Sequence, residues 1–423
     1  MSGRDYRGCS ISGATPVALE AYERALAAYQ SWRIGTVEPL GAALQHAPRF
    51  VMAHVLRAWQ LVCSRDPRSV ALARPLLAEA AGLSANEGER LHLAAIAATL
   101  SDDYDRAKTH LGDALLLQPR DALALQAAHS LDYLTGDLAR MRDRVKSVLP
   151  AWSAEMPGYH AVLAMHAFSL EECGEYDHAE QAARAALALK AGDARAHHAM
   201  AHVFEMTGRA EAGIRWMDDH FSGWGIDTVV ATHCWWHLAL FHLSLGNVDR
   251  ALAVYDQRLR SNPPRELSDL IDSSALLWRV DIHDGDTRGR WSELASAWTP
   301  HIDDRFCSFS DVHAMLAFVG ARDWAHADRL ERLLSGVQSF STRHGSTTRL
   351  LGLPACRALI AFGRGKDNIA ISLLAKLPTL AHRLGGSLAQ RDVLHLTLQR
   401  AIERVGRPLR RMRNAFPRLA AST

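Results

Sequence analysis

The sequence predicts an all-α fold, in which antiparallel helix pairs stack into a right-handed α-solenoid of about nine repeats. A turn residue recurs at Asp102, Gly136, Gly174, Gly208 and Gly246, so successive turns are 34, 38, 34 and 38 residues apart. Such a period is typical of two-helix repeats. Sustained alternation of Val, Ile and Thr, which would indicate strands, is nearly absent.

The segments that follow these turns share one pattern. "GEYDHAEQAARAALAL" at 174–189 has Gly, an aromatic residue, Ala and then Ala-Leu-x-Leu, and "DYDRAKTHLGDALLL" at 103–117 repeats it. The small residues let paired helices approach closely, and stacking of neighbours buries the apolar faces that one pair cannot bury alone. Weaker copies extend the array, with turns expected at Asp66, Gly289, Arg322 and Gly365.

We expect a single helical-repeat domain over residues 1–423. It would comprise N-terminal capping helices at 1–60, repeats at 61–380, and C-terminal capping helices with a basic tail at 381–423. The segment "HFSGWGIDTVV" at 220–230 interrupts the array, and its Trp224 is either a packed plug or part of a lid over the concave face. The tail carries Arg404, Arg407, Arg410, Arg411, Arg413 and Arg418. We interpret it as a solvated terminal helix, with an anion- or RNA-binding tail as the alternative.

Composition limits the classes of partner. Forty-eight basic and 46 acidic residues give a net charge of only +2, which argues against a general nucleic-acid binder. The chain start lacks a signal-peptide core, and nowhere do about 18 apolar residues run uninterrupted. The six cysteines lie far apart without a C-x-x-C pair, as in reduced proteins. We therefore expect a cytoplasmic protein without nucleic-acid or membrane partners, and leave a homodimer open.

Four phrases carry a more specific resemblance: "AFSLEECGEYDHAE", "HHAMAHVFEMTGR", "HCWWHLALFHLSLGN" and "GGSLAQRDVLHLTL". The first phrase contains the Gly-aromatic-Ala pattern of tetratricopeptide repeats, and together the four are similar to the tetratricopeptide repeat protein 38 family. The match extends from "LEAYERALAAYQ" to "LAQRDV", which is most of the chain. The resemblance implies a capped helical-repeat superhelix and implies little about chemistry.

The second phrase contains a polar stripe of His198, His202 and Glu205. On a helix these side chains fall within about 60° of one another, because each residue turns the chain by about 100°. The first helix of a tetratricopeptide repeat lines the concave surface, mainly through its fifth, ninth and twelfth positions. The repeat that turns at Gly208 starts at Ala194, which places the stripe at those positions. We therefore expect it to face a concave groove.

The neighbouring repeats add further residues to the same groove. The following repeat contributes His233, Trp236 and His237, and the preceding repeat contributes Phe168 and Glu171. Further along the chain we expect ligand-binding residues at Asp272, Asp311, His313 and Arg391. Arg391 follows a Gly-Gly turn and either holds a carboxylate or phosphate or ties down the last helix.

Two hypotheses from different classes follow. In the first, the protein is a binding module that holds a small molecule or peptide in the His/Glu/Trp/Arg-lined groove. In the second, it is an enzyme in which His198, His202, Glu205, His233 and His237 perform acid–base chemistry, since a His–Glu pair can hold an imidazole poised near neutral pH. We predict no cofactor. If a metal is bound, His198, His202 and Glu205 are its expected ligands, with His233 or His237 as a fourth.

Overall fold

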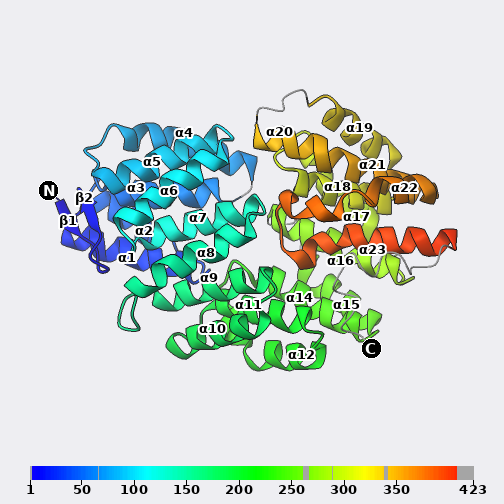
Figure 1. Ribbon diagram of the computed structural model, residues 1–423, viewed down its shortest axis with the longest axis horizontal. Helices are drawn as coiled ribbons and strands as arrows, with labels where there is room; N and C mark the ends of the chain where they lie inside the picture. The colour runs from blue at the N-terminus through cyan, green and yellow to red at the C-terminus, as the bar shows by residue number, and fades with distance from the viewer. Residues whose placement is uncertain (1, 65, 261–265, 288, 338–341, 407–423) are drawn as a thin grey trace. The chain divides into compact units, whose positions relative to one another are not determined.

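The computed structural model describes residues 2–64, 66–260, 266–287, 289–337 and 342–406. These residues form 23 α-helices and one short hairpin, which confirms the all-α prediction (Figure 1). The chain divides into two compact units, Met1–Ser261 and Asn262–Thr423. No helix in the described ranges is long and apolar enough to cross a bilayer. The basic tail from residue 407 onward lies outside the described residues.

Unit 1 opens with a hairpin in which β1 (Ser2–Arg4) pairs antiparallel with β2 (Ser10–Ser12). Its helices are α1 (Pro16–Gln30), α2 (Val37–His46), α3 (Val51–Val62), α4 (Pro67–Ala81), α5 (Glu87–Leu100), α6 (Tyr104–Leu117), α7 (Ala122–Leu134), α8 (Leu138–Val148), α9 (Tyr159–Glu172), α10 (Tyr176–Leu189), α11 (Ala194–Met206), α12 (Ala210–Asp219), α13 (Phe221–Trp224), α14 (Ala231–Ser244) and α15 (Val248–Val254). A 3₁₀ turn (Leu149–Ala151) follows α8, and a π-helical turn (Tyr255–Leu259) follows α15.

Unit 2 is also built from helices in its described residues. Its helices are α16 (Leu267–Ile282), α17 (Arg290–Trp298), α18 (Ser308–Gly320), α19 (Trp324–Ser335), α20 (Arg343–Thr347), α21 (Leu353–Gly363), α22 (Asp367–Leu374) and α23 (Leu388–Val405). Two 3₁₀ turns (Thr299–His301 and Pro378–Leu384) and a π-helical turn (Thr348–Gly352) connect them. Leu276, Leu316, Leu359 and Leu398 lie in its apolar interior.

The paired helices are joined by one recurring turn. A residue with positive φ separates the two helices of each pair from α5–α6 onward, at Asp102, Gly136, Gly174, Gly208, Gly246, Asp284, Arg322 and Gly365. Two expected turns differ. Asp284, not Gly289, makes the turn before α17, and Gly289 instead caps that helix. Asp66 has an extended backbone and caps α4 by accepting two backbone N–H groups, so it is not a left-handed turn residue.

Small residues set the spacing of the helices that matter for the site. Ala164 of α9, Ala186 of α10 and Ala196 of α11 are fully buried against one another, and these three helices pack side by side (Figure 1). The side chain of Asp193 starts α11 by accepting two backbone N–H groups, which satisfies donors that the first turn of a helix leaves free. The turn at Gly208 ends the helix. The start and end of α11 are therefore fixed locally.

The 220–230 segment is packed. Trp224 is 1% exposed, its indole Nε1 donates to the carbonyl of Met217, and its ring lies edge-on to Trp235. This matches the plug rather than the lid. The segment also anchors a distant part of unit 1, because the guanidinium of Arg33 donates to the carbonyls of Gly192, Gly223 and Ile226. Residues 31–34 are therefore held across the start of α11.

Gly174 provides a test of the recurring turn. A Cβ built on Gly174 meets nothing within 4 Å, so only its positive φ of 80° opposes a side chain. We expect Gly174→Ala to lower the free energy of unfolding by about 1 kcal/mol. Gly41, inside α2, also has open space around it but no positive φ. Gly41→Ala should therefore raise stability by about 0.5–1 kcal/mol. Chemical denaturation of both variants checks this, and equal effects would contradict the assigned turn.

Candidate functional site

Four histidines of unit 1 meet between two neighbouring helices. His198 and His202 lie one turn apart on α11, and His233 and His237 lie one turn apart on α14, which packs against α11. One ring nitrogen of each lies within 4.8 Å of the corresponding nitrogens of the other three. The Nε2 atoms of His198 and His202 are 3.0 Å apart. The four histidines that the sequence predicted for the site therefore lie together in one cluster.

Two carboxylates lie beside two of these rings. Glu205 Oε2 accepts from Nδ1 of His237 at 2.8 Å, and Glu171 Oε2 lies 3.4 Å from Nδ1 of His202. A carboxylate on one imidazole nitrogen fixes the tautomer and directs the lone pair of the other nitrogen away from it. Glu171, Glu172 and His202 also form a second close group, which shares His202 with the first. All three members of this second group are buried.

Aromatic rings surround the histidines. Phe168 of α9 contacts His198 and His202, with ring centroids 5.5 and 5.2 Å away. The indole of Trp236 stacks on His233 at 5.1 Å with an interplanar angle of 16°. Trp32, from the segment anchored by Arg33, lies 5.3 Å from His198. The polar groups are therefore enclosed in apolar surroundings, where electrostatic interactions are stronger than in water.

Burial determines the protonation state of His198. The side chain is 4% exposed, and burial, together with the neighbouring His202, His233 and His237, lowers the pKa of His198 well below its usual 6.5. His198 is therefore neutral at physiological pH. Its Nδ1 has no hydrogen-bond partner among the described residues. A neutral imidazole is the form that binds a metal ion or acts as a general base.

The arrangement fits a transition-metal ion. Four nitrogens placed tetrahedrally at about 2.0–2.1 Å from an ion lie about 3.3 Å from one another. The 3.0 Å between His198 Nε2 and His202 Nε2 is close to that value, and the remaining ligand atoms lie within 4.8 Å. Imidazole is a preferred ligand of Zn²⁺, Cu²⁺, Fe²⁺ and Ni²⁺. Glu205, expected as a third ligand, lies instead against His237 as an orienting group.

The predicted stripe does not line an open groove. His202 is 1% exposed and Trp236 is fully buried, because α9, α14 and the segment with Trp32 lie over this face of α11. Sequence reasoning missed Trp32, which no local pattern distinguishes. Its φ of 55° is rare for a bulky residue. It also missed Arg195, although Arg195 extends the stripe one turn toward the start of α11.

The remaining predicted residues belong to unit 2. Asp272 Oδ1 accepts from the Gln390 amide at 3.1 Å, and His313 Nδ1 lies 2.7 Å from the carbonyl oxygen of Phe309. Arg391 donates to the carbonyl of Gly386. This bond favours a role in holding the last helix in place over a role in binding an anion. Asp311 is 6% exposed, and burial raises its pKa to about 7.

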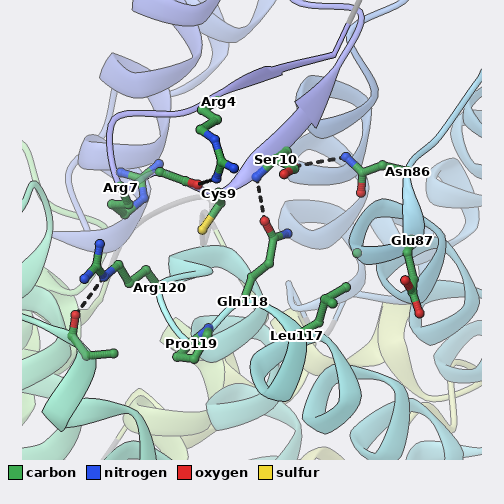
Figure 2. A pocket seen from close by; sticks show the side chains of 13 residues that line it. Arg4, Arg7, Cys9, Ser10, Asn86, Glu87, Leu117, Gln118, Pro119 and Arg120 are labelled. Atoms are coloured by element: carbon green, nitrogen blue, oxygen red, sulfur yellow. Dashed lines mark hydrogen bonds between the residues drawn. The ribbon is translucent and has the colours of Figure 1, made fainter.

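A separate pocket of about 560 Å³ lies beside the N-terminal hairpin (Figure 2). Its arginines already have partners. Arg7 pairs with Glu23 and Asp5, and Arg120 donates to the carbonyl of Ala151. Burial raises the pKa of the Cys9 thiol, which keeps it protonated and unreactive. The histidine cluster is therefore the better candidate. No protein-family model matches the chain.

Proposed function

We propose that unit 1 binds a divalent first-row transition-metal ion through His198, His202, His233 and His237, and uses it for chemistry on a small molecule. The convergence of four imidazoles, with Glu205 bonded to His237 and Glu171 beside His202, carries this proposal. Such carboxylate–histidine pairs support the ligands of many metal sites. His233 is the one ligand that is partly exposed, so a small molecule would approach from its side. The metal would act there as a Lewis acid.

We also infer that the helix pairs are tetratricopeptide-like repeats related to the tetratricopeptide repeat protein 38 family. The recurring positive-φ turn and the buried alanines between α9, α10 and α11 support this inference. The repeats would then serve as a scaffold that holds helices of successive pairs close enough for their side chains to meet. A peptide-binding module with an open groove has less support, since the expected groove residues are buried.

Acid–base chemistry without a metal is the second candidate. The 3.0 Å contact between His198 Nε2 and His202 Nε2 favours it, because one proton shared between two imidazoles gives the same geometry. A neutral His198 beside His202 and Glu171 could then accept a proton from a substrate. The two candidates differ in whether the cluster takes up a metal ion.

The test is metal titration of untagged protein from which bound metal has been removed with a chelator and the chelator then dialysed away. Isothermal titration with Zn²⁺, Co²⁺, Ni²⁺ and Mn²⁺ should show one tight site per chain, and bound Co²⁺ should give the strong visible absorption of a tetrahedral nitrogen site. His178→Ala serves as a control, because His178 lies at the surface on α10, away from the cluster. Saturable binding that His178→Ala leaves intact supports the proposal. If no tested metal binds, the metal-free candidate replaces it.

Glu205 provides a graded test of the orienting role. Glu205→Gln removes the charge but keeps the size of the group that accepts from His237 Nδ1. Loss of such a supporting carboxylate weakens metal affinity by about 10- to 100-fold. Glu175→Gln, outside the cluster on the turn before α10, is the control. A metal dissociation constant that is equal in wild type and Glu205→Gln would contradict this role of Glu205.

A further inference from the structure

Arg195 is a buried cation with few partners. Its side chain lies on α11, and the residue is 3% exposed. Its Nε donates one long bond, 3.3 Å, to the carbonyl of Gln30, and the ring of Trp32 covers one face of the guanidinium at 4.3 Å. No carboxylate among the described residues lies within ion-pair distance of it. Burial lowers the pKa of Arg195 to about 10.

Other buried arginines of unit 1 are paired. Arg7 lies 2.8 Å from both Glu23 and Asp5, and Arg144 lies 2.8 Å from Asp132. Desolvation of a guanidinium is costly unless an anion or several hydrogen bonds compensate it. The charge of Asp193 raises the pKa of Arg195 and so offsets part of this cost, but the Asp193 carboxylate caps α11 and lies 2.6 Å from His160 Nδ1. Among the described residues no carboxylate contacts the Arg195 guanidinium directly, and its Nη atoms could donate up to four hydrogen bonds. The Arg195 guanidinium therefore has room for a direct anionic partner that the described residues do not provide.

Arg195 lies on the same face of α11 as the histidines. His198 is one turn away and His202 two turns away, which places their Cα atoms about 4.5 and 10 Å further along the helix axis. Trp32 contacts both Arg195 and His198. The charge of Arg195 is also one of the influences that lower the pKa of His198. The guanidinium and His198 and His202 of the cluster thus lie on one face of α11, beside the same Trp32 ring.

We propose that Arg195 binds the carboxylate of the small molecule that reaches the histidine cluster. This rests on the proposed function and names the chemical class of its substrate. The planar guanidinium would hold a carboxylate through two parallel N–H···O bonds, while Trp32 excludes water from its face. The distance along α11 fits a compact organic acid whose reacting group lies several ångströms from its carboxylate.

The first experiment needs no metal. Thermal unfolding of metal-free protein is measured with a panel of small aliphatic and aromatic carboxylates at 50 mM, each beside its own primary amide. At least one carboxylate should raise the wild-type Tm by several degrees more than its amide does, because a ligand that binds only the folded state stabilises it. Arg195→Met should lose this shift, and Arg195→Lys should retain only part of it. Arg184→Met is the matched control, since Arg184 also lies over an indole, that of Trp216, but is exposed and paired with Glu180.

Arg195→Met should also raise the Tm of ligand-free protein, because it removes a buried charge that no carboxylate contacts directly among the described residues. Circular dichroism would detect a variant that fails to fold, and the comparison would then be made with Arg195→Lys. The second experiment adds the stabilising acid to Co²⁺-loaded protein. The visible spectrum of the bound Co²⁺ should change in wild type, and the change should be at least tenfold smaller in Arg195→Met. A carboxylate shift without Co²⁺ binding overturns the metal proposal and supports the arginine site. Co²⁺ binding without any carboxylate effect, or with an effect that Arg195→Met preserves, overturns the arginine site alone.

Discussion

Replacement of His202 by Ala is expected to abolish tight metal binding by unit 1, with a rise in dissociation constant of at least about 100-fold. His202 is the most connected member of the cluster. Its ring centroid lies 4.5 Å from that of His198 and 4.4 Å from that of His237, and its Nδ1 faces Glu171. Without it, the remaining ligands lose both an imidazole and the link to a supporting carboxylate. Isothermal titration with Zn²⁺ measures the change.

The effect of bound metal on the stability of the folded state provides a second test of His202→Ala. At a free metal concentration 100 times the dissociation constant, binding stabilises the folded state by about 2.7 kcal/mol. Wild type should therefore unfold at higher denaturant concentration with Zn²⁺ than with chelator, and His202→Ala should show no difference. His110→Ala, on α6 outside the cluster, should behave as wild type. A Zn²⁺ response retained in His202→Ala would refute the assigned ligand set.

Asp311→Asn is expected to stabilise the protein at pH 8 by up to about 4 kcal/mol, and to have little effect at pH 4. Burial raises the pKa of Asp311 from 3.8 to about 7, a difference worth about 1.4 kcal/mol for each unit. Between these values the folded state holds a proton that the unfolded state releases, so stability falls as pH rises from about 4 to about 7. Asn cannot ionise, so the variant should lack this decline.

The groups around Asp311 set the size of that effect. Arg305 lowers its pKa and Asp304 raises it, while its own backbone carbonyl accepts from the Cys356 thiol. Urea unfolding of wild type and variant at pH 4, 6 and 8 measures the difference between them. Asp328→Asn is the control, because Asp328 is exposed and paired with Arg364. A difference that does not grow with pH would show that Asp311 is ionised throughout.

Much of the fold could be predicted from turn chemistry. Glycine at 136, 174, 208 and 246 marks turns that need positive φ, and the structure has positive φ at each. At the turn before α17 the sequence pattern pointed to the wrong residue. Asp284 makes a turn that the sequence pattern assigned to Gly289, because Asp tolerates the left-handed region and Gly289 is needed nearby for a helix cap.

The site was predictable along each helix and between neighbouring repeats, but contacts from distant parts of the chain were not. Helical periodicity places His198 and His202 on one face, and repeat register aligns them with His233 and His237. Trp32 lies more than 150 positions away in sequence and reaches His198 only through the folding of residues 31–34 over α11. Burial of the stripe depends on that contact as well as on α9 and α14, and no periodicity within α11 encodes it.

X-ray absorption at the zinc edge of untagged, zinc-loaded protein tests the central claim most directly. The four-histidine assignment predicts one zinc per chain with four nitrogen ligands at about 2.0 Å and outer-shell scattering from imidazole rings that weakens in His202→Ala. A first shell dominated by oxygen, or a spectrum that His202→Ala leaves unchanged, would place the metal elsewhere and leave the His198–His202 contact as a shared proton.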